Sequence, residues 1–167
     1  IVDTLHAKGM HVVLSTVPVN LRQSAPFLSI GRDDLSASDE AKLAALRERA
    51  EAQALNGRWR EAQDLWQQAI ALDAGHADSH FQLATSLENL GEFALARSHY
   101  ERALDLDGLR FRADTRINAI IEGVAREYDS SNVSFVNSSK GFDRASAPYA
   151  PGWDLLVEHV HYDFSGN

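Results

Sequence analysis

The sequence predicts a predominantly helical chain in which a segment of mixed α/β structure is interrupted by an insertion made only of helices. The apolar residues keep a helical spacing from residue 41 to about residue 107. Within this stretch, residue types recur 34 positions apart. Two short β-branched runs, residues 10–16 and 133–136, flank it. The predicted parts are an α/β segment at 1–38, the all-α insertion at 39–110, and the rest of the α/β part at 111–167.

The repeat is visible in small and aromatic residues alike. A shift of 34 positions places Gly57 on Gly91 and Trp66 on Tyr100. The other matched pairs are Ala50 and Ala84, Trp59 and Phe93, Ala62 and Ala96, Ala69 and Ala103, Leu72 and Leu106, and Asp73 and Asp107. Small residues allow helices to approach closely, and glycine permits the positive φ of a tight turn. We therefore expect both glycines in turns between antiparallel helices, and both aromatic residues to be buried.

This period and its helix–turn–helix content resemble the tetratricopeptide repeat. The resemblance implies two repeats, at residues 43–76 and 77–110, and a groove between their first helices that binds a protein or peptide partner. The residues that would line this groove are Arg47, Glu51, Phe81, Thr85 and Glu88. Neither repeat ends in proline, because Ala74 and Gly108 stand there. Two unrelated amphipathic hairpins are the alternative.

Two repeats are few, because each one buries its apolar face only by stacking on a neighbour. A helix is expected over residues 109–128, where Ile117, Ile120, Ile121 and Val124 fall on one face. We expect this helix to cover the open end of the second repeat.

The flanking segments predict two strands and two loops. Residues 10–16 suit a strand buried on both faces of a parallel sheet. Residues 133–136 predict a second strand. Residues 21–38 predict a long loop that ends at a capping serine, Ser36 or Ser38. Residues 138–152, with two prolines and two glycines, also predict a loop.

The end of the sequence carries an acid, two residues, a histidine and then a glycine, at Glu158, His161 and Gly166. This pattern resembles the last conserved block of SGNH/GDSL hydrolases. The resemblance implies an SGNH/flavodoxin-like α/β fold, in which residues 133–136 lie parallel to residues 12–14 and the helix over residues 111–128 is the crossover. An ester substrate and no cofactor are implied too. The resemblance also implies that His161 is the general base and Glu158 the acid that orients it. The family usually has aspartate where Glu158 stands.

The Gly-Asp-Ser nucleophile block of that family does not occur in this sequence. We therefore expect the chain to be inactive by itself. The opening residues read as the middle of a helix, so upstream sequence is expected. Three alternatives stay open. The first is that His161 is an ordinary loop histidine, and the second is that Glu158, His159 and His161 hold zinc. The third is that the repeats bind a partner and the α/β part is catalytically silent.

The composition of the chain restricts the classes of partner that it is expected to bind. The net charge of −8 disfavours nucleic acid and anionic membranes, because like charges repel. No apolar run approaches the roughly 20 residues of a membrane span. The absence of cysteine excludes disulfides and thiolate chemistry, but it does not determine the compartment. Four arginines are expected to pair with nearby aspartates on a solvated face: Arg110, Arg112, Arg116 and Arg126 with Asp105, Asp107 and Asp114. The alternative is that these arginines bind an anionic ligand or an acidic partner.

Overall fold

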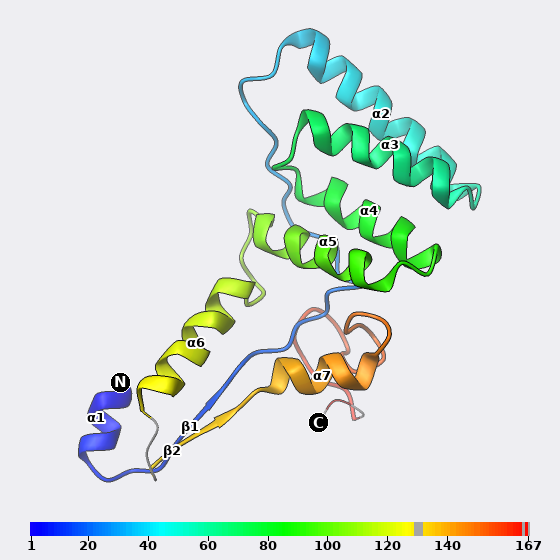
Figure 1. The fold of residues 1–167 in the computed structure, drawn as a ribbon. Coiled ribbons are helices and arrows are strands. Elements are labelled where there is room, and N and C mark those ends of the chain that lie inside the picture. Colours follow the sequence, from blue (N-terminus) through cyan, green and yellow to red (C-terminus); the bar gives the residue numbers. More distant parts are fainter. Residues whose placement is uncertain (129–131, 165, 167) are drawn as a thin grey trace.

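The computed structural model describes residues 1–128, 132–164 and 166, and it is predominantly helical (Figure 1). Four helices stack at one end of the molecule, and two strands with three further helices form the other end. The elements in chain order are α1 (Val2–Ala7), β1 (Val12–Ser15), α2 (Ala37–Leu55), α3 (Trp59–Leu72), α4 (Ala77–Asn89), α5 (Phe93–Leu106), α6 (Thr115–Glu127), β2 (Val133–Val136) and α7 (Ser138–Ser146).

The all-α insertion consists of two antiparallel hairpins, α2–α3 and α4–α5, and α3 packs against α4. Gly57 and Gly91 lie in the two hairpin turns with φ of +71° and +77°. A side chain at either position would be strained, which explains why glycine recurs there. Every residue from 43 to 106 is described, and none lies in a strand. The predicted hairpins are therefore confirmed.

The core of the hairpins is built from the residues that recur at the repeat spacing. Trp66 and Tyr100 are 1% and 2% exposed, as predicted. The small residues that allow the helices to approach are buried as well: Ala50, Ala62, Ala69, Ala84, Ala96 and Ala103. Close helix packing and large buried rings follow from the same repeated pattern.

The strands β1 and β2 are parallel neighbours, with Val12 opposite Val133 and Ser15 opposite Val136. The whole repeat insertion and α6 lie between them in the sequence. Helix α6 packs against both strands and provides the crossover that parallel strands need. The predicted pairing is confirmed. Within the described residues the sheet has two strands, so a larger SGNH/flavodoxin-like sheet is not seen.

Three details of the α/β part differ from the sequence prediction. The first strand is not buried on both faces, because the side chain of Val13 is 60% exposed. The helix expected from residue 109 begins at Thr115, since the Asp114 side chain accepts a hydrogen bond from the N–H of Ile117 and caps it. Residues 138–152 are not all loop. Asn137 caps α7 in the same way, and α7 buries Phe142.

The open end of the second repeat is covered by residues other than those expected. Helix α6 leads away from α5 toward the strands, and its Ile120 stays 63% exposed (Figure 1). Instead Val19, Leu21 and Ala150 join the core of the repeats. The expectation for α6 is therefore wrong. The turn between α5 and α6 redirects the chain, and an extended segment covers the end of the repeats.

Candidate functional site

An extended segment, residues 17–36, runs from β1 to α2 along the stacked hairpins, and we call it the strap (Figure 1). The Asp107 side chain holds its middle. The N–H groups of Phe27 and Leu28 donate to the two Asp107 carboxylate oxygens, at 2.9 and 3.1 Å. Ser29 also forms a β-bridge with Asp107. One aspartate after α5 thus binds the main chain of a passing segment.

The matching aspartate of the first repeat does the same. Asp73 Oδ2 accepts a hydrogen bond from the N–H of Arg32 at 3.3 Å, and Oδ1 accepts one from Gly75 at 3.0 Å. Asp73 and Asp107 are only 1% and 3% exposed. The 34-residue repeat pairs these two residues, but the sequence pattern assigned them no role. Their recurrence at the repeat spacing is the signal that could have revealed one, because a buried carboxylate needs partners.

Arg112 completes the contact around Asp107. Its guanidinium donates to the carbonyl oxygens of Asn20 and Ser24 and to Asp107 Oδ2, the last at 3.2 Å. Burial alone raises the pKa of Asp107. The hydrogen bonds from Phe27, Leu109, Leu28 and Arg112 outweigh it and hold that pKa below its usual value.

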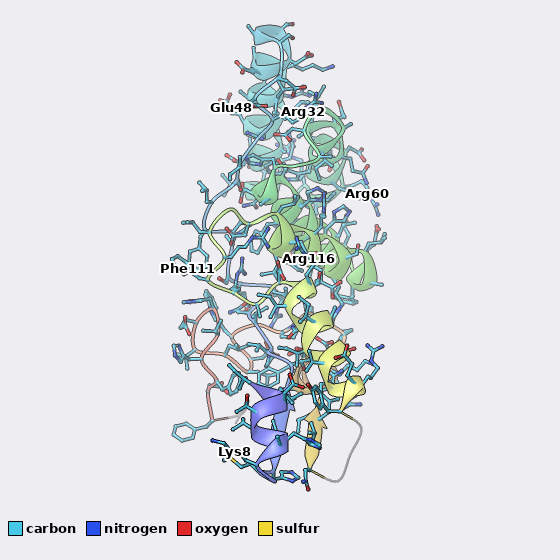
Figure 2. The ribbon with its side chains drawn as sticks, turned by 90° about the vertical axis from the view of Figure 1, so that its left-hand side faces the viewer. Lys8, Arg32, Glu48, Arg60, Phe111 and Arg116 are labelled. Atoms are coloured by element: carbon cyan, nitrogen blue, oxygen red, sulfur yellow. The ribbon has the colours of Figure 1, made fainter. Side chains whose placement is uncertain are left out.

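The prediction of a solvated arginine face is therefore wrong for Arg112, which is 4% exposed. Arg110 does pair with Asp114, and Arg126 lies 3.5 Å from Glu122. The side chain of Arg116 projects from α6 (Figure 2). Arg112 differs from its neighbours because the strap covers it and supplies two carbonyl acceptors.

The five predicted groove residues lie on α2 and α4. Arg47 Nη2 is 3.8 Å from Asp73 Oδ2, and Glu51 is exposed one turn further along α2. Phe81 packs edge-on against Tyr100 with ring centroids 5.3 Å apart, and Thr85 bonds back to the Phe81 carbonyl. These contacts locate the residues, and partner binding by them stays a prediction.

Glu88 is half-buried beside another part of the chain. Burial raises the pKa of Glu88, and the nearby Arg22 opposes this rise. Arg22 in turn binds Asp154 at 2.9 Å and lies over the Tyr149 ring. The strap and residues 149–154 therefore crowd the C-terminal end of α4, and the first repeat is the more open part.

A cavity of about 300 Å³ lies between the strap and α2. Arg47, Leu35 and His76 are among its lining residues. Burial lowers the pKa of the Arg47 guanidinium, and the nearby Asp73 carboxylate only partly offsets this. Arg47 Nε has no hydrogen-bond partner among the described residues. The cavity thus combines an apolar wall with the Arg47 cation and with two carboxylates, those of Glu40 and Asp73.

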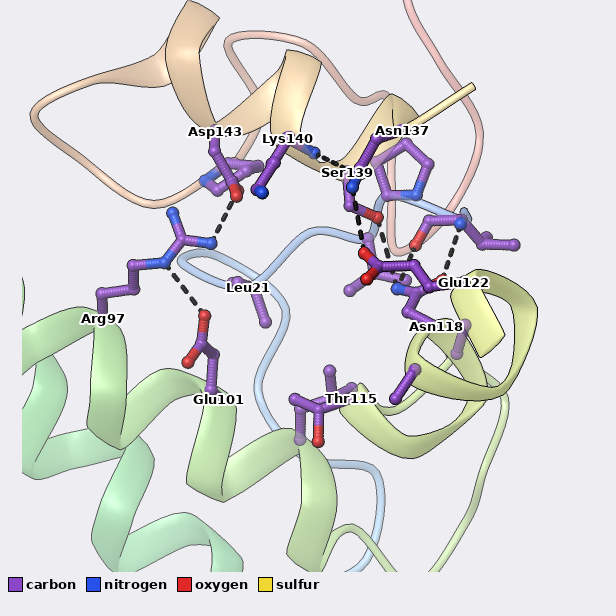
Figure 3. Close-up of a pocket in the computed structure, with 17 residues that line it drawn as sticks. Leu21, Arg97, Glu101, Thr115, Asn118, Glu122, Asn137, Ser139, Lys140 and Asp143 are labelled. Atoms are coloured by element: carbon purple, nitrogen blue, oxygen red, sulfur yellow. Dashed lines mark hydrogen bonds and ion pairs between the residues drawn. The ribbon is translucent and has the colours of Figure 1, made fainter. Parts of the chain in front are cut away.

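A second cavity, of about 290 Å³, opens at the carboxyl ends of β1 and β2, between α5, α6 and α7 (Figure 3). Ligands of α/β proteins commonly bind at that end of the strands. Arg97 on α5 crosses its rim and binds Glu101 at 2.9 Å and Asp143 at 2.7 Å. Lys140 also lines this cavity, but neither Glu158 nor His161 does.

The polar side chains around this second cavity are largely occupied with one another. Asn118 accepts from the N–H of Val17 at 2.8 Å and donates to its carbonyl at 3.0 Å. Asn137 donates to Glu122 Oε1 at 2.9 Å (Figure 3). Thr16 donates to Asn137 at 3.2 Å. These bonds fix α6 and α7 against the strand ends, which is a structural role.

Glu158 and His161 are brought together on the C-terminal loop. Glu158 Oε1 lies 2.5 Å from His161 Nδ1 and accepts from the His161 N–H at 2.7 Å. Slight burial raises the pKa of Glu158, but backbone hydrogen bonds from His161 and Val160 and the imidazole contact lower it to about 2. The His161 side chain is 82% exposed, so its Nε2 faces solvent. Their catalytic role stays a prediction.

The repeats and the strap hold this loop in place. The N–H of Asn20 donates to the His159 carbonyl at 3.0 Å, and the Phe27 ring packs edge-on against the His159 ring. Val160 packs against the core of the repeats. His159 Nδ1 also contacts the second oxygen of Glu158. Across residues 1–128, 132–164 and 166, however, no group of three or more histidine, cysteine, aspartate or glutamate side chains is placed to hold a metal ion.

Comparison with known proteins supports the repeat. A search of curated proteins gives no match. In the described part of the chain, no helix is both long and apolar enough to cross a bilayer. Residues 77–109 match the family described as Tetratricopeptide repeat, and this match gives no support to a hydrolase origin of the flanking segments. The matched residues span α4 and α5. The chain therefore contains a tetratricopeptide repeat at its second hairpin, stacked on a first hairpin of the same form.

Proposed function

We propose that this chain is a protein-interaction module whose stacked hairpins bind an extended segment of a partner protein. The observation that carries the proposal is the pair of equivalent aspartates, Asp73 and Asp107, which bind the N–H groups of the strap. Main-chain hydrogen bonds of this kind recognise an extended segment whatever its side chains are. The repeats thus already hold one such segment, which belongs to the chain itself.

The partner would bind beside the strap, at the cavity that Arg47 lines. Leu35 and Leu43 provide its apolar surface, and the Arg47 guanidinium provides a fork that suits a carboxylate. Glu40 and Asp73 also line this cavity, and their negative charge disfavours a second acidic group there. We infer a partner segment with an apolar side chain close to one aspartate or glutamate.

The test is selection of peptides from a displayed library on the folded chain, followed by affinity measurement. Peptides with one acidic residue near an apolar one should be enriched. Arg47→Glu should weaken the best of them at least ~10-fold, since it replaces attraction by repulsion. Arg49→Glu is the matched control, because Arg49 is exposed on the same helix and does not line the cavity. Equal losses in both variants would contradict the assignment of this surface.

A second function is favoured by the contact between Glu158 and His161. In serine hydrolases an acid bonds the Nδ1 side of the histidine, and Nε2 takes the proton of the serine. Glu158 and His161 have this arrangement, with Nε2 exposed. We infer that they can serve as the acid–base half of an esterase or acyl hydrolase when a serine nucleophile is supplied from outside this sequence.

We expect the chain by itself to hydrolyse p-nitrophenyl acetate no faster than buffer, because a histidine without an activated nucleophile gives weak general-base help. When a Gly-Asp-Ser block is supplied in a longer protein, His161→Ala should lower kcat by several orders of magnitude. Glu158→Gln should lower it less, because the side chain keeps its shape. Turnover by the chain alone that disappears in His161→Ala would contradict the first expectation. An unchanged kcat in the longer protein would remove this second function.

A further inference from the structure

The two repeats differ at one core position and at a half-buried position that faces it. At the repeat spacing His80 falls on Leu46, and His99 falls on Leu65. Both leucines are buried, at 5% and 7% exposed, and His80 is equally buried at 6%. The second hairpin therefore carries two imidazoles where the first carries two leucines.

The two rings are joined by one hydrogen bond. His80 Nδ1 and His99 Nδ1 are 2.9 Å apart. The ring centroids are 5.2 Å apart and the planes differ by 23°. Centroids this far apart with nitrogens this close require rings that lie end to end and nearly in one plane. The bond is thus a direct N–H···N contact between the ring edges.

The proton positions follow from a third partner. His80 Nε2 lies 3.3 Å from the carbonyl oxygen of Ala74, which can only accept. Nε2 of His80 therefore carries a proton, and its Nδ1 accepts from His99 when both rings are neutral. One added proton leaves the contact intact, because neutral His99 can hold its proton on Nε2 and accept from His80 through Nδ1. Protonation of both rings puts N–H against N–H and breaks the contact between α4 and α5.

The residues around the two rings do not neutralise a positive charge on His80 or His99. Facing His80 are His76 at the start of α4, with His99 and Arg102 on α5. Burial is the main cause that lowers the pKa of His80 and of His99, and for His80 the neighbouring cations lower it further against the bond to Ala74. Among the described residues no carboxylate bonds either ring.

The pair is connected to the strap through the turn after α3. Ala74 lies in that turn, beside Asp73, which binds the N–H of Arg32 in the strap and that of Gly75. The strap is also bound to α4 itself, because the Asp78 N–H donates to Ser29 Oγ at 2.7 Å. We propose that the His80–His99 pair is a pH-sensitive element, which holds α4 against α5 at neutral pH, and that loss of this contact in acid loosens the turn and the strap. This inference stands independently of the protein-interaction proposal.

The direction of the pH dependence follows from proton linkage. The pKa of each ring is lowered from the ordinary 6.5 in the folded chain. Below about pH 6.5 the unfolded chain therefore binds more protons than the folded one, and stability falls as the pH falls. Above about pH 7 both states hold neutral rings, and the pair adds no pH dependence.

The experiment compares the chain with the double variant His80→Leu/His99→Leu, which installs the residues of the first repeat. Urea unfolding at about pH 7.5 and about pH 5 spans the range in which histidine titrates. The folding constant of the unchanged chain should fall roughly tenfold more than that of the variant over this range, the cost of an unsatisfied buried polar group. Hydrogen exchange of the Arg32 and Gly75 amides, corrected for intrinsic pH effects, should rise in acid only in the unchanged chain.

His11→Gln is the control, because His11 is exposed and lies far from the pair in the fold, with Ser134 as its partner. It should keep the pH profile of the unchanged chain. His76 remains in the double variant, so a small residual slope is expected there. A slope in the double variant equal to that of the unchanged chain would overturn the proposal. If the variant does not fold, NMR titration of the unchanged chain decides: midpoints below 6.5 for both rings support the proposal, and midpoints at or above 6.5 reject it.

Discussion

Trp66→Ala is expected to lower the free energy of unfolding by about 3–5 kcal/mol, which is the usual cost of removing a large buried ring. Trp66 is 1% exposed and belongs to the cluster that joins the two hairpins. Small residues of both hairpins surround this cluster, among them Ala50 and Ala84, which cannot expand to fill the hole. Urea denaturation followed by circular dichroism measures the loss.

Trp153→Ala is the matched control for this prediction. Trp153 is the same residue type but 62% exposed, so its replacement should change the free energy of unfolding by no more than about 0.5 kcal/mol. Similar losses in both variants would show that the stacked hairpins are not the centre of the fold.

Asp107→Ala is the second large effect that we expect, again about 3–5 kcal/mol. The substitution removes the acceptor of the Phe27 and Leu28 N–H groups and leaves the Arg112 guanidinium buried without its counter-ion. Breaking one partner of a buried ion pair costs more than the pair contributes, because an uncompensated charge remains. Chemical denaturation gives the free energy, and hydrogen exchange of the Phe27 and Leu28 amides reports release of the strap.

Two variants make this prediction specific. Asp34→Ala removes an exposed carboxylate that pairs with Arg32, and it should cost the least of these variants because solvent screens the pair. Asp107→Asn keeps one acceptor oxygen, so its loss should fall between the other two. A loss for Asp107→Ala no larger than that for Asp34→Ala would mean that the carboxylate does not anchor the strap.

The hairpins could be predicted because their signals are local or periodic. Gly57 and Gly91 mark the turns by a conformation that other residues avoid, and the recurring alanines and aromatics mark the faces that pack. The surface of the hairpins is as polar as the pattern implies, with Glu48 and Arg60 on the outside (Figure 2). Parallel pairing of β1 with β2 was also predicted, but through a family resemblance and not through any local signal.

The sequence predictions that were wrong, for β1 and for residues 138–146, failed because tertiary contacts decided the outcome. Val13 carries the β-branched side chain of a buried strand, but its exposure depends on how many neighbours the sheet has. Residues 138–146 contain a glycine and several serines, which disfavour a helix, yet Asn137 caps α7 and burial of Phe142 stabilises it. In both cases tertiary contacts outweighed the local preference.

The sequence by itself determined the hairpins, their period, the identity of the buried rings and the spacing of Glu158 and His161, because each depends on residues within one or two helical turns or one repeat. Tertiary structure alone decided that the strap lies along the repeats and that Arg112 is buried. It also decided that His80 meets His99. Asp107 and Phe27 are 80 residues apart. No periodic pattern encodes such a contact, because it forms only when a backbone donor from one segment satisfies a carboxylate that another segment has buried.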